Sequence, residues 1–208
     1  AVYLGGRNEV RLIDLKNFQD KLVVKDEIWG FQNSMPGFSP NDEYIVFTAY
    51  RNFEQDIMLH NIKQNKTINL TNSGITESDP IWSPDGKYIY FHSSRLKASY
   101  PMGMQNPKIY RLPLEKLDAP FHSDKFDEMF TVEKKDTTVK KDSAANNITS
   151  TDSKKPVVID LENIMERIEQ VSPPFGSQYL KYVYHKGDKT TVFYASDHGE
   201  GKPALWKT

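Results

Sequence analysis

The chain has 208 residues, a formal net charge of −1, and 38% hydrophobic and 12% aromatic residues. The nearly balanced charge argues against a nucleic-acid-binding surface and against electrostatic docking to a membrane. The absence of cysteine excludes disulfide bonds and thiolate metal sites. No apolar run approaches the roughly 18 residues of a transmembrane helix. The first residues do not have the pattern of a signal peptide, and because Ala1 falls inside a predicted strand we expect upstream sequence, which could carry a targeting signal.

A phrase of the sequence recurs at an interval of 44 residues. Residues 36–51, PGFSPNDEYIVFTAYR, return as residues 80–95, PIWSPDGKYIYFHSSR, and residues 2–7, VYLGGR, lie another 44 residues upstream of residues 46–51. A period of roughly 44 residues is the length of one four-stranded propeller blade, and each blade buries its faces only against its neighbours. We therefore predict an all-β fold, a β-propeller of four-stranded antiparallel blades, with a partial ring in this chain.

The predicted strands follow this period, and we label them a to d within each blade. The first blade has strands b, c and d at residues 2–4, 9–15 and 21–24. The second has strands a to d at residues 35–38, 44–49, 56–62 and 67–70. The third has strand a ending at Trp82, then strands b and c at residues 87–93 and 108–112. The fourth has strands a and b at residues 179–184 and 190–196, and strand c begins at residues 204–208.

Composition divides the chain into three parts. Residues 1–130 hold the first blades, and residues 156–208 hold the end of the third blade and a partial fourth. Between them, residues 131–155 are mostly Lys, Asp, Thr, Ser and Asn. This charged insert has too few apolar residues to offset the entropy of ordering, so we predict that it is disordered.

Residues 162–171 allow two interpretations. Ile164, Ile168 and Val171 are spaced as one face of a helix. The third blade, however, still lacks its d strand at this point, and residues 167–171 fall where that strand belongs. We favour the short strand.

The side chains that could carry chemistry are few. We find no nucleophile elbow, no zinc-binding His-Glu-x-x-His and no phosphate-binding loop, so the sequence predicts no catalytic residue, no metal site and no cofactor. We expect His60 and His92 to be packing or hydrogen-bonding residues of strands. We expect Trp82, with Phe38 and Tyr184 at the same position of the repeat, to lie in the core between blades.

Arg7, Arg51 and Arg95 share one position of the repeat. One interpretation is structural: each blade rebuilds the same hydrogen bond or ion pair with its neighbourhood. The other is functional: the three guanidinium groups form a ring of positive charge that contacts peptides and holds a terminal carboxylate. The sequence leaves both interpretations open.

The repeat resembles that of a known group of proteins. The core SPDGKYIYF, followed by SSR, is similar to the β-propeller repeat of TolB and of tricorn-type serine peptidases. Three further stretches bring the chain closer to tricorn-like tail-specific peptidases: GGRNEV at residues 5–10, NFEQDI at 52–57, and IDLENIMERI at 159–168 after the charged insert.

The resemblance implies a function without implying catalytic residues here. In that family the propeller precedes a separate serine peptidase core, and nothing in this sequence corresponds to that core. The chain would then be a non-catalytic propeller segment that admits or guides peptides, with further blades and the peptidase core as its partners in one polypeptide. The alternative is a stand-alone TolB-like scaffold that binds proteins. Similarity to bacterial relatives implies an exported, periplasmic protein, although some tricorn-type enzymes are cytoplasmic.

Overall fold

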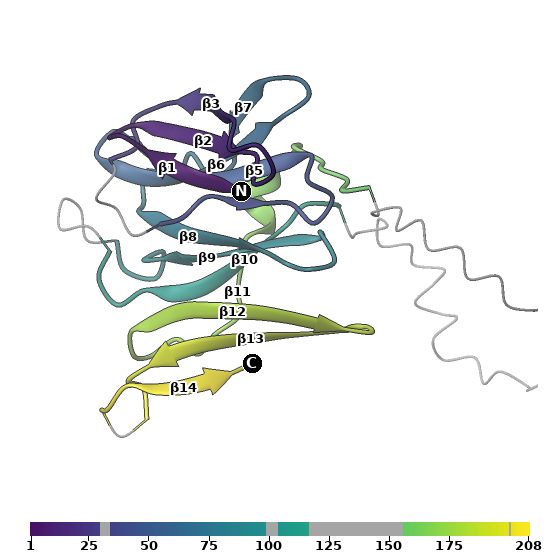
Figure 1. Cartoon of the computed structure of the whole chain (residues 1–208). Coiled ribbons are helices and arrows are strands. Elements are labelled where there is room, and N and C mark those ends of the chain that lie inside the picture. The colour runs from purple at the N-terminus through teal and green to yellow at the C-terminus, as the bar shows by residue number, and fades with distance from the viewer. Residues whose placement is uncertain (30–33, 99–103, 117–155, 200) are drawn as a thin grey trace, which may run out of the picture. The chain divides into compact units, whose positions relative to one another are not determined.

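The computed structural model describes residues 1–29, 34–98, 104–116, 156–199 and 201–208. All of these except Lys116 belong to one compact unit, which comprises residues 1–115 and 155–208. The predicted disordered insert at 131–155 and the predicted boundary at residue 130 lie outside the described residues. The described part is built from antiparallel sheets and contains one short 3-10 helix and no α-helix, which confirms the predicted fold class (Figure 1).

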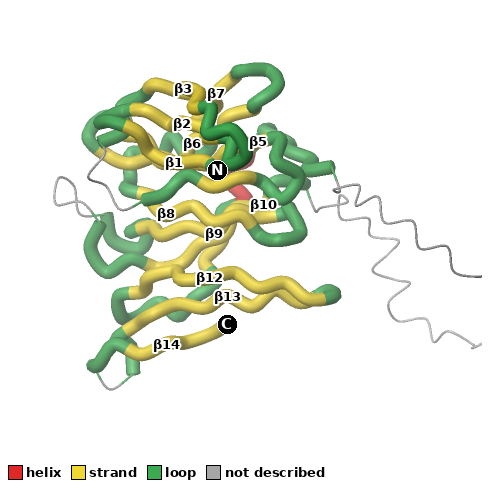
Figure 2. Tube along the Cα trace, viewed as in Figure 1, coloured by secondary structure: helices red, strands yellow, loops and turns green. Residues whose placement is uncertain are grey.

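Four sheets follow one another along the chain, and neighbouring strands in the sequence are neighbours in each sheet (Figure 2). The first sheet contains β1 (Val2–Gly5), β2 (Glu9–Ile13) and β3 (Asp20–Lys25). The second contains β4 (Gly37–Phe38), β5 (Tyr44–Arg51), β6 (Glu54–Asn61) and β7 (Lys66–Asn69). The third contains β8 (Glu77–Trp82), β9 (Tyr88–Ser93), β10 (Lys108–Pro113) and β11 (Glu169–Gln170). The fourth contains β12 (Gln178–Lys186), β13 (Lys189–Ser196) and β14 (Ala204–Lys207).

The repeated Ser-Pro phrase forms the turn between the first two strands of a sheet. The Ser39 hydroxyl donates a hydrogen bond to Asn41 Oδ1 at 2.7 Å and accepts one from the Tyr44 backbone N–H at 3.0 Å. The next sheet repeats both bonds at distances of 2.5 and 2.9 Å, with Ser83, Asp85 and Tyr88. The serine thus replaces missing backbone partners in the turn, which explains why the phrase recurs with the period of the sheets.

Three apolar clusters join the sheets in sequence. Because side chains alternate across a strand, β5 directs Ile45 and Phe47 to a cluster shared with the first sheet and Val46 to a cluster shared with the third. In the same way, β9 directs Ile89 and Phe91 toward the second sheet and Tyr90 toward the fourth. The second and third sheets are therefore buried on both faces, as a propeller requires.

The outer faces of the first and fourth sheets differ in chemistry. On the first sheet, Arg11 lies 2.7 Å from a Glu9 carboxylate oxygen and 2.6 Å from an oxygen of Asp20, and Tyr3 donates a hydrogen bond to Asp20. On the fourth sheet, the face turned away from the core is mostly apolar or aromatic, with Tyr182, Tyr184 and Leu205 exposed, and it also carries Thr191 and Lys207. The outer face of the first sheet is therefore dominated by charged residues, and that of the fourth sheet by aromatic and apolar ones.

Residues 162–171 contain both of the predicted alternatives in short form. A 3-10 helix, η1 (Ile164–Arg167), buries Ile164 in the cluster between the second and third sheets. The chain then enters the two-residue strand β11, which pairs with β10 at the edge of the third sheet. The predicted d strand is therefore present, but it is shorter than the predicted residues 167–171.

Of the three residues predicted for the core between blades, Trp82 is buried and Phe38 packs against a buried cluster. Tyr184 contradicts the prediction, because it is 45% exposed on the outer face of the fourth sheet. The turn between β12 and β13 has two residues, whereas the Ser-Pro-Asp-Gly turn is longer, so the alternation is displaced by one position. Val183 is the residue that packs toward the third sheet.

Replacing Trp82 tests the stacking of the sheets. Trp82→Ala should lower the free energy of unfolding by about 3–5 kcal/mol, because it leaves a cavity between the second and third sheets. Leu205→Ala, on the exposed outer face, should change it by about 0.5 kcal/mol or less. Urea titration followed by far-UV circular dichroism measures both values, and equal effects would contradict the described packing.

Candidate functional site

The predicted arginines lie at one end of the sheets. The β1–β2 and β5–β6 turns are at this end, and the crossover from β3 to β4 begins there, since Asp26 N–H donates to the Asn8 carbonyl and Tyr50 N–H to the Glu27 carbonyl. We call it the hairpin end. The exposed Arg7 lies in the β1–β2 turn, Arg51 ends β5, and Arg95 follows β9.

Arg51 makes a bidentate ion pair with Asp26 of the β3–β4 crossover. Its Nη1 and Nη2 atoms each lie 2.8 Å from one of the two carboxylate oxygens. The hydrogen bond to Asp26 raises the pKa of the Arg51 guanidinium above its usual value. The pair fixes the crossover against the end of β5, so Arg51 joins the first and second sheets.

Arg95 pairs with a different carboxylate. Its Nε atom donates to Glu77 Oε1 at 2.8 Å, and Glu77 in β8 is completely buried. Burial raises the pKa of the Glu77 carboxyl, although the positive charge of Arg95 opposes this shift. Burial also raises the pKa of Glu54, whose carboxylate accepts a hydrogen bond from Thr76. Arg51 and Arg95 are thus paired with carboxylates at positions that are not equivalent in the repeat.

His92 and Asp79 form a pair that superficially resembles part of a catalytic triad. Asp79 Oδ2 lies 2.9 Å from His92 Nδ1, and the backbone N–H of Leu180 donates to His92 Nε2. The Leu180 bond requires an unprotonated Nε2, so Nδ1 carries the proton and donates to Asp79. Both ring nitrogens are therefore occupied, and the imidazole joins the third and fourth sheets instead of facing a nucleophile. His60 also lies in a strand and contacts Thr67, as expected for a hydrogen-bonding residue.

Asp79 has an unusual backbone conformation. Its φ is +54°, and it lies in a β-bulge between Ser78 and Ile81. Burial raises the pKa of the Asp79 carboxyl, but the hydrogen bond to His92 and the charge of His92 lower it by more. The pKa of Asp79 therefore lies below its usual value. A cavity of about 220 Å³ lies beside this carboxylate, lined by Ser34, Gln55, Ser78, Asp79, His92, Met104, Pro107 and Tyr179. The carboxylate thus combines a bulged backbone, a hydrogen bond to His92 and a place in the lining of this cavity.

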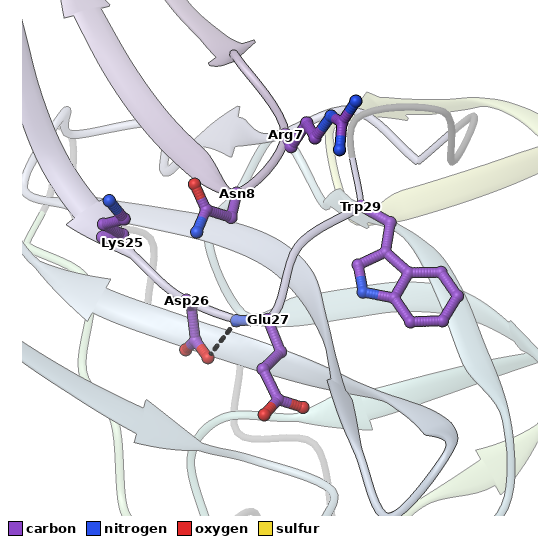
Figure 3. A pocket seen from close by; sticks show the side chains of 6 residues that line it. All are labelled: Arg7, Asn8, Lys25, Asp26, Glu27 and Trp29. Carbon is purple, nitrogen blue, oxygen red and sulfur yellow. Dashed lines mark hydrogen bonds between the residues drawn. The ribbon is translucent and has the colours of Figure 1, made fainter.

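Two larger hollows meet at Trp29 in the crossover. The first, of about 640 Å³, is lined by Arg7, Asn8, Lys25, Asp26, Glu27 and Trp29 (Figure 3). The second, of about 820 Å³, is lined by Asp26, Glu27, Trp29, Tyr50, Arg51, Asn52 and Phe53. We call the second hollow the Trp29–Phe53 groove. The Trp29 indole is stacked on the Tyr50 ring with centroids 4.6 Å apart, so the two rings form one wall of the groove.

The repeat predicts the three arginines but not the aromatic residues that lie beside two of them. Trp29 lies in a crossover outside the repeated phrase, and Phe53 lies in the two-residue turn that follows Arg51. An aromatic residue in a tight turn, where Asn-Gly is favoured, was the available signal for Phe53. Among the described residues there is no group of acidic and histidine side chains able to hold a metal ion.

Comparison with known proteins agrees with the fold. No protein-family model matches the chain, and no curated protein matches it in sequence. The structure of TolB from Agrobacterium tumefaciens is similar over 92% of this chain and 46% of its own, with a TM-score of 0.53 and 16% identity. The tricorn protease is similar over 97% of this chain and 19% of its own, with a TM-score of 0.54 and 14% identity.

These likenesses show the fold, a β-propeller of the type found in TolB and in the tricorn protease. The chain spans less than half the length of either structure. No helix in the described part of the chain is long and apolar enough to cross a membrane.

Replacing Arg51 and Arg95 one at a time tests whether the stability that each contributes depends on the burial of its ion pair. Arg95→Met should lower the free energy of unfolding by about 3–5 kcal/mol, because it leaves the buried Glu77 without its counter-ion. Arg51→Met should cost about 1 kcal/mol or less, since the Arg51 side chain is 34% exposed. Urea titration at constant salt checks both values. Equal small losses would contradict a structural role for Arg95.

The Arg95→Met variant should also respond differently to pH. A carboxyl whose folded-state pKa is raised contributes stability that is present at low pH and lost as pH rises through that pKa. Loss of Arg95 raises the pKa of Glu77 further, so acidification from pH 7 to 5 should stabilise the variant relative to the parent protein. The double variant Arg95→Met/Glu77→Gln is the control and should lose this difference. Urea midpoints at the two pH values give the answer.

Proposed function

We propose that this chain is a non-catalytic β-propeller segment of a tricorn-like serine peptidase, in which it binds peptides and serves their access to the peptidase core. The observation that carries the proposal is the pair of adjoining hollows at the hairpin end, which combine aromatic and charged side chains from the turns and the crossover that join the strands. Clefts of this size and mixed composition are typical of ligand sites, and loops on a rigid scaffold commonly carry them.

The engagement of His92 supports a binding role over catalysis. Acyl transfer needs a base that is hydrogen-bonded to a nucleophile. The Asp79–His92 pair instead receives the Leu180 backbone N–H on the nitrogen that would act as the base. We therefore propose that hydrolysis belongs to a separate core of the same polypeptide.

The outer face of the fourth sheet supports further blades as partners. Tyr182 is 58% exposed and Leu205 is 69% exposed on this face. The equivalent faces of the second and third sheets are covered by the next sheet. We propose that another blade covers the fourth sheet in the same way, which would extend the arc toward a complete ring.

A stand-alone TolB-like scaffold for protein binding is the alternative, and the nearly equal TM-scores of 0.53 and 0.54 do not separate the two. The downstream coding sequence would, because only the first proposal requires a serine peptidase core there. Location in the periplasm is part of the same proposal, and cell fractionation with an antibody against this chain would test it against a cytoplasmic location.

Of the three arginines proposed to contact peptides, Arg7 is the one that is exposed and lines a hollow. Fluorescence anisotropy with labelled decapeptides should show binding, and mass spectrometry should show no cleavage. Arg7→Ala should weaken the binding of peptides with a C-terminal carboxylate about threefold and reduce the salt dependence of that binding. The binding of amidated peptides should change little. Lys16→Ala, which removes an exposed charge from the β2–β3 turn, is the matched control.

Two results would contradict the proposal. Cleavage that a serine-directed reagent abolishes, and that mock preparations lack, would show a catalytic site in this chain. Absence of binding to any peptide of a diverse library would remove the binding role.

A further inference from the structure

Phe53 is exposed in a conformation that does not suit its side chain. Its φ is +69°, next to Asn52 at +51°, in the two-residue turn between β5 and β6. Glycine is favoured at such a position because a side chain is strained there. The ring is 81% exposed, so burial in the core does not offset the strain. Strained residues cluster at functional sites, and Phe53 also lines the Trp29–Phe53 groove.

The Trp29–Phe53 groove around this ring is aromatic and acidic. Trp29, Tyr50 and Phe53 contribute three rings. The charged residues of its lining are two carboxylates, Asp26 and Glu27, against the single guanidinium of Arg51. Arg51 is bound to Asp26 through both of its terminal nitrogens. The carboxylate of Glu27 is therefore the negative charge that this ion pair does not balance.

Glu27 and Trp29 are arranged to act together. Figure 3 shows the Glu27 carboxylate and the Trp29 indole extending to the same side of the crossover, whereas Lys25 and Arg7 extend elsewhere. Lys25 and Arg7 line the first hollow and not the Trp29–Phe53 groove. An aromatic face beside a carboxylate suits a flat cation, which gains from both the ring and the negative charge.

We infer that the Trp29–Phe53 groove binds an arginine side chain of a partner polypeptide. The guanidinium is planar, stacks on aromatic rings and donates paired hydrogen bonds to a carboxylate, whereas the ammonium of lysine is more strongly hydrated and does not stack. This inference rests on the proposed peptide-binding function and refines it by naming the side chain that is recognised. It assigns the groove a ligand charge opposite to that expected at Arg7.

The test is a titration of the chain with three short peptides, Ac-Gly-X-Gly-NH2, in which X is arginine, lysine or citrulline. Citrulline has nearly the shape of arginine and no charge. The indole N–H resonances of ¹⁵N-labelled protein report on Trp29, Trp82 and Trp206 separately, and Trp29→Phe assigns the first. The Trp29 signal should shift with the arginine peptide, and the citrulline peptide should bind about tenfold more weakly.

Two variants test the groove. Glu27→Gln should weaken binding of the arginine peptide about three- to fivefold, and Phe53→Gly should weaken its binding about two- to fivefold. Phe53→Gly should melt no lower than the parent protein, because glycine relieves the strained turn. A loss of binding in a variant of full stability cannot be ascribed to unfolding.

Phe18→Gly is the matched control. Phe18 is also exposed, at 72%, and also has a positive φ of 56°, but it lies in the β2–β3 turn, at the opposite end of the first sheet. Its replacement should relieve similar strain and leave arginine binding unchanged.

Three results would overturn the inference. These are equal binding of the arginine and citrulline peptides, equal loss of binding in Phe18→Gly and Phe53→Gly, and a shift of the Trp82 or Trp206 signal without a shift of Trp29. If longer peptides still bind the chain in these cases, the inference fails and the proposed function stands. If no peptide binds at all, both fail.

Discussion

The whole structure depends on burying both faces of the inner sheets. A strand covered on one side needs only one apolar row, but β5 and β9 supply two, and each row serves a different neighbour. A register slip by one residue would exchange the two rows and disturb two clusters at once. This two-sided burial adds to the hydrogen bonds within each sheet in fixing the register of the strands, and the register sets the positions of the turns.

The candidate site inherits its rigidity from that constraint. The β5–β6 turn follows directly from the register of two buried strands, so Asn52 and Phe53 are held at a defined position without contacts of their own to the core. The β3–β4 crossover is attached by the Arg51–Asp26 pair and by the bond from Tyr50 N–H to the Glu27 carbonyl. This backbone hydrogen bond and this ion pair together position Trp29 at the rim of the groove.

The sequence was sufficient to predict the sheets, because a residue buried between blades must recur in each blade. The Ser-Pro turns and the b strands appear where the repeat places them. The failure at Tyr184 shows the limit: a turn shorter than its counterparts displaces the alternation, and composition does not reveal this. The site was harder to predict, because Trp29 and Phe53 occur once and have no counterpart in the repeat. Equivalent arginines also acquired different partners, Asp26 and Glu77, which only the three-dimensional contacts reveal.

The contrast between the two outer faces affects how copies of the chain can meet. Contact between the fourth sheet of one copy and the first sheet of the next would be head-to-tail, and such contacts grow into fibres when they do not close. That junction would remove Arg11, Glu9 and Asp20 from water and place them against tyrosine and leucine side chains. These side chains provide no opposite charge to compensate for the lost hydration. The charged face therefore disfavours this head-to-tail contact, and the mostly apolar face of the fourth sheet is better matched by a partner with an apolar surface.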